Sequence, residues 1–590
     1  MSDIAALMAD NLDVWTGAIE RKSGAGRGGG KRISLYGIER LRALILDLAV
    51  RGKLVPQDME DEPASELLKQ VAQARNRKIL AGEVRKPKAF AALPSNLSSL
   101  PPGWVWTQLA AIAEINPSNS VANDVDASFV PMTLVSTSVS GKHKDEVRNW
   151  GEIKKGFTQF ADGDLGLAKI TPCFENGKAA IFQNLANGIG AGTTELHVAR
   201  PWLNELNRRY LLLTMKTGSY LSNGEKLMTG TAGQKRVTRS YFEATPLPLP
   251  PLAEQQRIVA KVDELMALCD ALERDSAGSM AAHQALVEIL LATLVNSADA
   301  TDLARDWARL ERHFDTLFTT NASIDTLKQT ILALAVRGKL ADQDGADEPA
   351  AALLKNVEKQ RAALLKKNFP NAAEANTQLK KQNIQKIPIG LPKLPHGWDW
   401  ATLMQCSMLV IDCKNKTAPY ADEGVRLIRT TNVRHGQLNA KDQRFVNDET
   451  FEKWSLRAKP IAGDLLITRE APMGEACLIP EGELICLGQR MMLARFIPGT
   501  IIARYILITF MAPDLMERVQ DKPIGMTVEH LRVGGVETLL VPIPPLAEQR
   551  RIVAKVDALL ALCDALKARL ADAAQTQRHL ADAITQRAAA

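Results

Sequence analysis

The sequence predicts an α+β fold in which two mixed α/β domains are joined by two long helical, coiled-coil spacer regions. Three observations lead to this prediction. One long segment is written twice, its apolar residues follow a helical seam, and the two regions that precede the copies have equal length but unlike sequence. A chain of 590 residues that repeats its segments in the same order is expected to repeat a structural frame.

The repeated segment is predicted to be a helix. Residues 250–272 read PPLAEQQRIVAKVDELMALCDAL, and residues 544–566 read PPLAEQRRIVAKVDALLALCDAL. The paired prolines end whatever precedes the segment, and good helix formers follow them. Because the apolar residues recur with the 4, 3, 4, 3 spacing of a coiled-coil seam, we expect each helix to bury its seam against its twin. The seam residues are Ile258, Val262, Leu265, Cys269 and Leu272 in the first copy and Ile552, Val556, Leu559, Cys563 and Leu566 in the second.

Both helices are predicted to continue beyond the repeated segment. Neither Gly nor Pro occurs between Leu252 and Arg274, or from Leu546 to the end of the chain. A helix that ran from residue 252 to Leu294 would be ~60 Å long at 1.5 Å per residue. Gly278 is the position at which this helix could break, because glycine is a poor helix former.

Two shorter repeats surround the mixed domains. Residues 45–54 (ILDLAVRGKL) and 331–340 (ILALAVRGKL) both precede an Asp-Glu-Pro-Ala sequence and an amphipathic run. Residues 100–106 (LPPGWVW) and 394–400 (LPHGWDW) open the two mixed domains, whose short apolar runs are broken by Gly, Asn and Pro in the manner of strands and loops. The predicted parts are an N-terminal extension with a basic Gly-rich linker (1–37), a helical region and linker (38–99), domain 1 (100–250), a central helical spacer (251–366), a linker (367–393), domain 2 (394–544) and a C-terminal spacer helix (545–590).

The composition favours a reduced, cytoplasmic protein. The seven cysteines include no Cys-x-x-Cys pair, and two of them lie on the helical seam. No run of 18 apolar residues suggests a membrane span, and the N-terminus lacks the basic-then-apolar pattern of a signal peptide. A net charge of +6 permits binding to nucleic acid without demonstrating it.

Motifs for catalysis fail on inspection. Residues 24–31 (GAGRGGGK) do not form a P-loop, because Ala25 replaces a required glycine and Arg32 replaces the Ser or Thr after the lysine. The eight histidines are scattered, and no H-E-x-x-H or Asn-Pro-Pro-aromatic motif occurs. Glu152 and Lys154, with Asp145 nearby, resemble a metal-nuclease triplet only in residue type, and we interpret them as part of a charged loop. We therefore expect no catalytic centre, metal or cofactor in this chain.

Loops rich in hydrogen-bond donors are the remaining candidates for function. Domain 1 contains KITPCFENGK (169–178) and GTAGQKRVTR (230–239), and domain 2 contains RTTNVR (429–434), REAPMG (469–474) and GQR (488–490). Such side chains can bind phosphates, Arg and Lys also suit guanine, and Asn and Gln suit adenine. The alternative is that they are ordinary solvated loop residues. The predicted DNA-binding residues are Lys169, Thr171, Asn176, Lys178, Gln234, Lys235, Arg236, Arg429, Asn432, Arg469, Gln489 and Arg490.

These motifs together resemble the specificity subunit of type I restriction–modification enzymes. The resemblance includes the repeated helix, the LAVRGKL turn, the Gly-Trp entry to each domain and the Gly-Asp-Leu strands at 163–165 and 463–465. It covers nearly the whole chain, in the right order and in two copies. The N-terminal extension, up to Ser34, departs from the pattern.

The resemblance implies a non-catalytic, DNA-binding subunit of a restriction and DNA-modification system. Each mixed domain would be a target recognition domain that reads one half of a bipartite, asymmetric site. The long helices would form antiparallel spacer regions with pseudo-two-fold symmetry. They would hold the two readers apart by about one DNA turn, ~34 Å. The implied partners are double-stranded DNA, two methyltransferase subunits that bind S-adenosylmethionine and modify adenine, and two nuclease subunits that use ATP and Mg²⁺. The alternatives are a coiled-coil scaffold without DNA specificity and a nuclease that acts alone.

Overall fold

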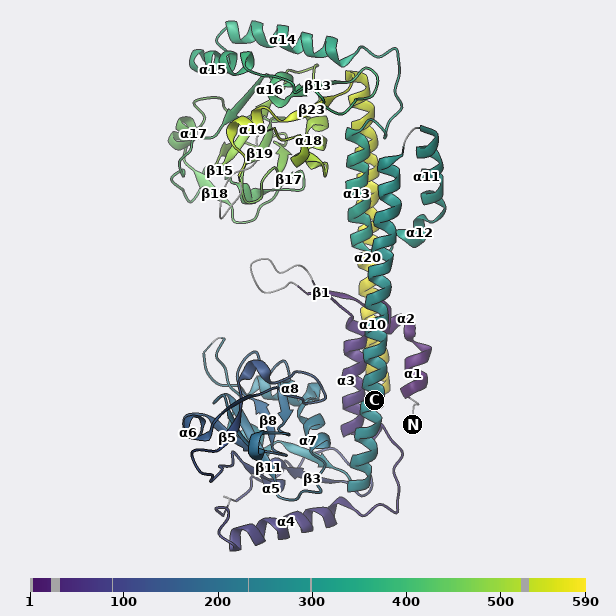
Figure 1. Ribbon diagram of the computed structural model, residues 1–590, viewed down its shortest axis with the longest axis vertical. Helices are drawn as coiled ribbons and strands as arrows, with labels where there is room; N and C mark the ends of the chain where they lie inside the picture. Colours follow the sequence, from purple (N-terminus) through teal and green to yellow (C-terminus); the bar gives the residue numbers. More distant parts are fainter. Residues whose placement is uncertain are drawn as a thin grey trace. The chain divides into compact units, whose positions relative to one another are not determined.

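A computed structural model describes residues 4–22, 32–86, 89–231, 233–297, 300–520 and 530–589. The chain divides into two compact units, of which unit 1 contains residues 1–279 and 572–590 and unit 2 contains residues 280–571 (Figure 1). The predicted Gly-rich linker at 24–31 lies outside the described residues. Each unit holds one mixed domain, the start of one long helix and the end of the other.

The long helices are α10 (Leu252–Asn296) and α20 (Leu546–Ala589). Gly278 does not break α10, and no other atom lies within 4 Å of the place where its Cβ would be. Among the described residues, α10 is also the one helix that is long and apolar enough to span a membrane by length and composition alone, a test that core helices also pass.

The helical part of unit 1 includes the N-terminal extension, whose structural role could not be predicted from the sequence. Trp15 in this extension is fully buried in the same hydrophobic cluster as the first half of α10. A Cβ on Gly37 would lie 2.5 Å from the Trp15 carbonyl oxygen, so the extension and the helix that follows it fit only around a glycine. The extension therefore covers the helical core. Its elements and the next two helices are α1 (Ile4–Asp10), α2 (Leu12–Gly17), β1 (Glu20–Lys22), β2 (Arg32–Ser34), α3 (Tyr36–Val50) and α4 (Ala64–Leu80).

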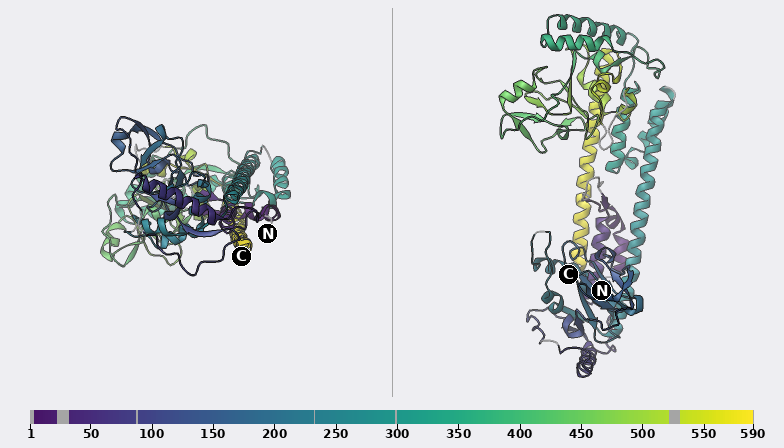
Figure 2. Two further views of the ribbon diagram at one scale, coloured as in Figure 1. Left: turned by 90° about the horizontal axis from the view of Figure 1, so that it is seen from below. Right: turned by 60° about the vertical axis from the view of Figure 1, so that its left-hand side comes forward.

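In unit 1, α3 lies between the two long helices (Figure 2). Near its start, Tyr36 Oη donates to Asp582 of α20 at 2.9 Å, and at its end Arg51 donates to the carbonyl oxygen of Ala589 at 3.1 Å. These two contacts show that α3 runs parallel to the end of α20. Arg42, in the middle of α3, pairs with Asp270 of α10 at 2.6 Å, and the turn after α3 packs near the start of α10. The helix α3 therefore runs antiparallel to the start of α10. The start of α10 and the end of α20 therefore run in opposite directions within this unit.

Unit 2 repeats this arrangement with α13 in the place of α3. Lys328 pairs with Asp564, and Asp325 pairs with Lys567, so α13 runs antiparallel to the start of α20. Gln284 of α10 donates to Thr326 at 3.1 Å, which places the end of α10 on the other side of α13. The helices of unit 2 are α11 (Ala300–Arg312), α12 (Phe314–Leu317), α13 (Asn321–Val336), α14 (Ala350–Lys366) and α15 (Ala372–Asn383).

The predicted seam residues are buried or partly buried, but the two copies belong to different hydrophobic clusters, the first in unit 1 and the second in unit 2. The expectation that each helix buries its seam against its twin is therefore wrong. Seven of the ten seam residues are buried, and the other three are partly buried against the same clusters. Burying one such side chain contributes about 1.5–3 kcal/mol relative to leaving it in water. In each cluster the seam residues occur together with residues of a shorter helix, α3 in unit 1 and α13 in unit 2, and with residues near the end of the other long helix. The fully enclosed seam residues are Ile258, Val262, Leu265, Cys269, Ile552, Val556 and Cys563, with Leu272, Leu559 and Leu566 at the edges.

Domain 1 contains two four-stranded sheets, ordered β6-β5-β10-β7 and β4-β11-β8-β9, and the pair β12-β3. The strand expected at the Gly-Asp-Leu sequence 163–165 is β8 (Leu165–Ala168), which is buried along its whole length because it lies inside its sheet. The elements are β3 (Val105–Gln108), α5 (Leu109–Ile112), β4 (Ala113–Ile115), β5 (Asp126–Val130), η1 (Met132–Leu134), β6 (Glu146–Asn149), α6 (Trp150–Ile153), β7 (Thr158–Ala161), β8 (Leu165–Ala168), β9 (Ala179–Ile181), η2 (Ala186–Gly188), β10 (Ile189–Gly192), β11 (Leu196–Pro201), α7 (Arg208–Met215), α8 (Gly218–Lys226), α9 (Arg239–Ala244) and β12 (Pro246–Leu249).

Domain 2 has the same plan, with sheets β14-β22-β19-β20, β18-β15-β21, β13-β23 and β16-β17. Two buried ion pairs mark the equivalence, Asp164 with Arg200 at 2.8 Å in domain 1 and Asp464 with Arg495 at 2.7 Å in domain 2. The predicted fold class, two mixed domains on long helices, is confirmed. The elements are β13 (Asp399–Thr402), α16 (Leu403–Cys406), β14 (Leu409–Asp412), β15 (Val425–Ile428), η3 (Thr430–Asn432), β16 (Val433–Arg434), β17 (Gln437–Leu438), β18 (Arg444–Val446), α17 (Asp448–Trp454), β19 (Leu465–Thr468), β20 (Ala476–Leu478), β21 (Ile485–Leu487), β22 (Met491–Arg495), α18 (Ala503–Met511), η4 (Leu515–Arg518), α19 (Val533–Glu537) and β23 (Leu540–Ile543).

Candidate nucleic-acid interface

The two donor-rich loops of domain 1 lie side by side. The first follows β8, and the second leads into α9. The backbone N–H of Val237 donates to the Lys169 carbonyl at 2.8 Å, and the N–H of Thr171 donates to the Lys235 carbonyl at 2.9 Å. The fold therefore joins two segments that are about 60 residues apart in the sequence, as a shared binding surface requires.

Three of the predicted residues in these loops are exposed, namely Asn176, Gln234 and Lys235. Arg236 is partly exposed, and its guanidinium forms two hydrogen bonds with the Glu195 carboxylate, at 2.8 and 2.9 Å. This pairing lowers the pKa of Glu195 and leaves the remaining donors of Arg236 in a fixed direction.

The other three predicted residues of domain 1 are partly buried, and two of them have partners within the protein. Lys178 Nζ donates to the Met132 carbonyl at 2.7 Å, which directs its charge into the domain and assigns it to holding the neighbouring loop. Thr171 Oγ1 donates to Glu175 at 3.1 Å, and Lys169 is half-buried at the end of β8. Thr171 and Lys178 therefore help to hold these loops together, and their contact with DNA stays a prediction.

The three loops of domain 2 also meet. The Arg469 N–H donates to the Arg490 carbonyl at 3.0 Å, the Gly488 N–H donates to the Ile428 carbonyl at 2.8 Å, and Arg434 reaches the Ala471 carbonyl at 3.4 Å. The cluster is assembled from three separate stretches of chain, in the same part of the fold as the loops of domain 1.

Two predicted residues of domain 2 are buried. Asn432 is 1% exposed, and its amide bonds the Arg429 N–H and the Lys441 carbonyl, at 3.0 and 2.8 Å. Arg469 is 6% exposed, and its guanidinium lies 3.5 Å from the carboxylate of Asp412. Neither side chain has a free edge to present to a base, so both serve the internal structure of their loops.

The remaining predicted residues of domain 2 are partly exposed and have polar partners. Arg429 pairs with Asp442 at 2.7 Å, and this hydrogen bond lowers the pKa of the Asp442 carboxyl. Arg490 lies 3.3 Å from Glu470, and the side-chain oxygen of Gln489 accepts a hydrogen bond from Thr417 at 3.2 Å. Such partners orient a side chain before it meets a ligand.

The comparison of the two domains reveals a loop of domain 1 that the sequence analysis missed. Residues 131–145 join β5 to β6 as residues 429–443 join β15 to β18. This loop runs along β9, where the Ile181 N–H donates to the Gly141 carbonyl at 3.0 Å, and it exposes Ser138, Lys142 and Lys144. The signal that could have found it is its place after the first strand of the small sheet, because its residues do not resemble RTTNVR.

A buried lysine ties this loop to the first donor-rich loop. Lys216 Nζ donates to the Gly177 carbonyl at 2.8 Å and to the Thr137 carbonyl at 3.2 Å. The residue is 7% exposed, and burial lowers the pKa of its ammonium group to about 7, with a further contribution from the charge of Arg209. Met511 occupies the equivalent position at the end of α18.

The other sequence candidates do not assemble into a catalytic site. Lys154 donates to the side chain of Asn123, Asp145 accepts from Ser128, and Glu152 is exposed on α6. Within the described ranges, no group of three or more His, Cys, Asp or Glu residues is placed to hold a metal ion.

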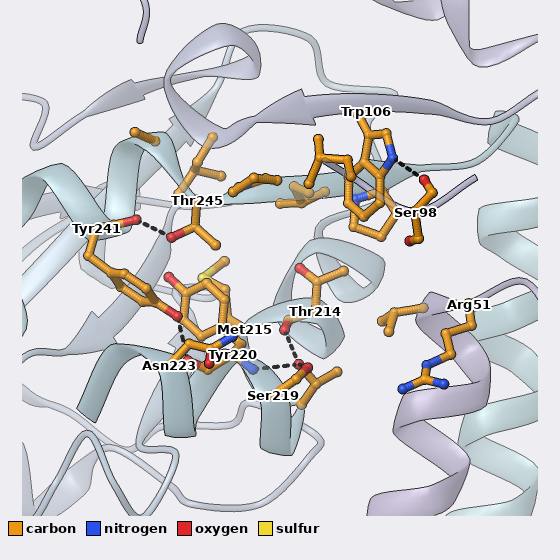
Figure 3. Close-up of a pocket in the computed structure, with 18 of the residues that line it drawn as sticks. Arg51, Ser98, Trp106, Thr214, Met215, Ser219, Tyr220, Asn223, Tyr241 and Thr245 are labelled. Atoms are coloured by element: carbon orange, nitrogen blue, oxygen red, sulfur yellow. Dashed lines mark hydrogen bonds between the residues drawn. The ribbon is translucent and has the colours of Figure 1, made fainter. Parts of the chain in front are cut away.

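A cavity of about 1080 Å³ lies in unit 1 between domain 1 and the end of α3 (Figure 3). Trp106, Tyr220 and Tyr241 line it, and Trp106 Nε1 donates to the Ser98 carbonyl at 2.9 Å. None of the predicted DNA-binding residues lines this cavity, so it is separate from the loop clusters.

Two domains of one fold with unlike polar loops, carried on duplicated helices, define a class of DNA-specificity proteins. The family model described as type I restriction modification DNA specificity domain matches residues 103–277 and 412–575. The chain is 43% identical over 602 residues to the EcoAI specificity subunit and over 601 residues to the EcoEI specificity subunit, both from Escherichia coli, and covers 99% of each. The chain belongs to the family of type I restriction–modification specificity subunits.

A solved structure gives a weaker likeness. The HsdS subunit from Thermoanaerobacter tengcongensis is 19% identical, with a TM-score of 0.39, over 84% of this chain and 98% of that one. The family assignment rests on the two full-length relatives and on the family model.

Proposed function

We propose that this chain gives a type I restriction–modification system its DNA specificity, with each mixed domain reading one half of a bipartite, asymmetric site. The observation that carries the proposal is that the same fold occurs twice and gathers different polar loops each time. Contacts to phosphates would set the register of the protein on DNA, and loop side chains would specify the bases.

The exposed loop residues supply suitable chemistry. In domain 1, Gln234 can pair with adenine, and Lys235 can bind guanine or a phosphate. In domain 2, Arg429 and Arg490 offer guanidinium groups held by carboxylates, and Gln489 lies beside Arg490. Because the two sets differ, the two half-sites would differ too.

The helices offer two equivalent surfaces for a partner. Leu268 and Leu562 occupy the same position in the repeated segment and are 46% and 62% exposed. A single exposed apolar side chain is ordinary on a protein surface, so the support for a docking surface is that the same exposed leucine recurs in both repeated helices. Two near-identical segments fit two copies of one protein, which we propose to be the methyltransferase subunit.

The catalytic cofactors would belong to the partners. Methyl transfer to adenine requires a base extruded from the duplex and S-adenosylmethionine, and we assign both tasks to the methyltransferase subunits. ATP and Mg²⁺ would serve the two nuclease subunits of the complete complex.

A domain swap tests this function. Residues 394–544 are replaced by the corresponding domain of another family member, the chain is co-expressed with its methyltransferase, and methylated adenines are mapped. One half of the modified motif should change, and the other should remain. A change in both halves, or in neither, would refute the modular assignment.

The alternative of a scaffold without DNA specificity makes a different prediction. A scaffold complex would show no preference for the mapped site over unrelated DNA. A specific complex should prefer it and should lose affinity steeply as salt rises, because Lys and Arg contacts release counterions from the phosphates.

A further inference from the structure

The three sequence repeats meet at one place in each unit, which we call the junction. In unit 2 the junction consists of Gly338, Lys339, Trp398, Glu548 and the end of α10. In unit 1 the same parts are Gly52, Lys53, Trp104, Glu254 and the end of α20. The LAVRGKL turn, the Gly-Trp entry and the repeated helix are thus parts of one structural device.

The lysine of the junction caps the end of a long helix. Lys339 Nζ donates to the carbonyl oxygens of Val295 and Ser297, each at 2.8 Å. In unit 1, Arg51 and Lys53 both donate to the Ala589 carbonyl, at 3.1 and 3.3 Å. The last carbonyls of a helix have no partner within the helix, and a cation there also interacts favourably with the helix dipole.

The glycine of the junction allows the LAVRGKL turn to pack closely against the Pro and Trp residues at the start of the mixed domain. Gly338 has φ +66°, and a Cβ there would lie 2.6 Å from Cγ of Pro395 and 3.1 Å from the ring of Trp398. Gly52 has φ +67° and meets Pro101 and Trp104 in the same way. Only glycine satisfies both the backbone angle and the close approach.

The tryptophan of the junction joins the mixed domain to the start of the other long helix. Trp398 Nε1 donates to Glu548 at 3.0 Å, and Trp104 Nε1 donates to Glu254 at 2.8 Å. Both carboxylates are 1% exposed and lie in the first turn of their helices, where the dipole favours negative charge. Burial raises the pKa of both carboxyls.

Each long helix is therefore anchored at both ends. The contacts at Glu254 and Ser297 hold α10, and those at Glu548 and Ala589 hold α20. A helix anchored near both termini has a fixed number of residues between its anchors and hence a fixed length at 1.5 Å per residue. Without its cap, the last turn frays and the length becomes variable.

We propose that the two junctions set the number of base pairs between the half-sites, with Lys339 and Lys53 as positioning residues. This inference rests on the proposed function. Lys339 donates to two carbonyls at 2.8 Å, and Lys53 donates to the Ala589 carbonyl at 3.3 Å, so both lysines hold the end of a long helix.

The experiment measures selectivity for the gap. The full chain is co-expressed with its methyltransferase, the modified motif is mapped, and methylation rates are measured on duplexes that keep both half-sites but lengthen or shorten the gap by one base pair. In the Lys53→Met/Lys339→Met variant, the ratio of the rate on the natural gap to the rate on the altered gaps should fall at least 10-fold. The bases of each half-site should remain the same, because the reading loops are untouched.

Three further variants control for folding and charge. Lys355→Met removes an exposed lysine from α14 and should leave the ratio unchanged. Lys339→Arg keeps a cation that can donate to both carbonyls and should retain most of the selectivity. Trp398→Phe removes the N–H that donates to Glu548 and the part of the indole ring that lies against Gly338, so it disturbs the junction at a second place. If the lysine variant fails to fold, this variant tests the junction, and it should lower the selectivity for the natural gap in the same way.

The possible results separate this inference from the proposed function. The contradicting result is that the lysine or tryptophan variants melt cooperatively and still show the selectivity of the natural chain for its gap. In that case the junctions do not set the gap, and the inference is overturned. If the unaltered complex modifies no split site at all, the proposed function fails and the junction inference fails with it.

Discussion

Replacement of Lys216 by methionine should change the pH dependence of the stability of domain 1. Lys216 bridges two loops through backbone carbonyls, and its ammonium group has a pKa lowered by burial from the usual 10.5 to about 7. Methionine is the natural residue at the equivalent position, Met511, so the substitution suits this fold.

The direction in which stability changes with pH follows from the protons that the folded and the unfolded chain bind. Below pH 7 the lysine is charged in both the folded and the unfolded state, and folding bears the full cost of burying the charge. Between pH 7 and 10.5 the unfolded chain keeps the proton and the folded chain releases it, so stability rises with pH. One pKa unit corresponds to about 1.4 kcal/mol, so the free energy of unfolding should gain about 2–3 kcal/mol between pH 7 and 9 through this group.

The assay compares the full-length chain with the Lys216→Met variant in urea at pH 7, 8 and 9. Hydrogen exchange read by mass spectrometry on peptides of domain 1 reports its unfolding separately from the rest of the chain. The difference in unfolding free energy should move by about 2–3 kcal/mol in favour of the natural lysine over this range. Lys144→Met, which removes an exposed lysine from the neighbouring loop, should produce no such trend. A Lys216→Met difference that is independent of pH would refute the reasoning.

Three other predictions concern DNA, the helices and the partner. Alanine at residues 234–236 should weaken DNA binding by the complex at least 10-fold and reduce the salt slope by about 2, because two cations are lost; unchanged affinity in a filter-binding assay would remove this loop from the interface. Proline at Leu265 or Leu559 should cost ~3 kcal/mol or more, seen as a lower melting temperature by circular dichroism, and an unaltered melting curve would argue against a helical seam. Glutamate at Leu268 or Leu562 should each remove one methyltransferase copy, counted by native mass spectrometry, and two retained copies would place docking elsewhere.

The architecture was predictable because it depends on repetition and periodicity. The apolar spacing from Ile258 to Leu272 predicts a buried helical face, and the duplicated order of segments predicts two equivalent units. The donor-rich loops could be found in the sequence by their composition, but their contact with one another could not, because it depends on the fold. The signals that allowed these predictions are local in the sequence, or they recur in it.

The roles of individual side chains were not predictable, because they depend on contacts distant in sequence. Lys339 donates to carbonyls 42 and 44 residues away at the end of α10, and the LAVRGKL motif gives no indication of this contact. Asn432 looked like a base-reading amide, but it is buried by its own loop. Trp15 lies in the N-terminal extension, outside the repeated segments, and its packing against Gly37 could not be read from them.

Mapping of methylated adenines in cells with and without this gene tests the central claim most directly. The account predicts a split motif with two unlike halves and a fixed gap, present only when this chain is expressed with its methyltransferase. A continuous or symmetric motif, or a motif that persists without the gene, would contradict it.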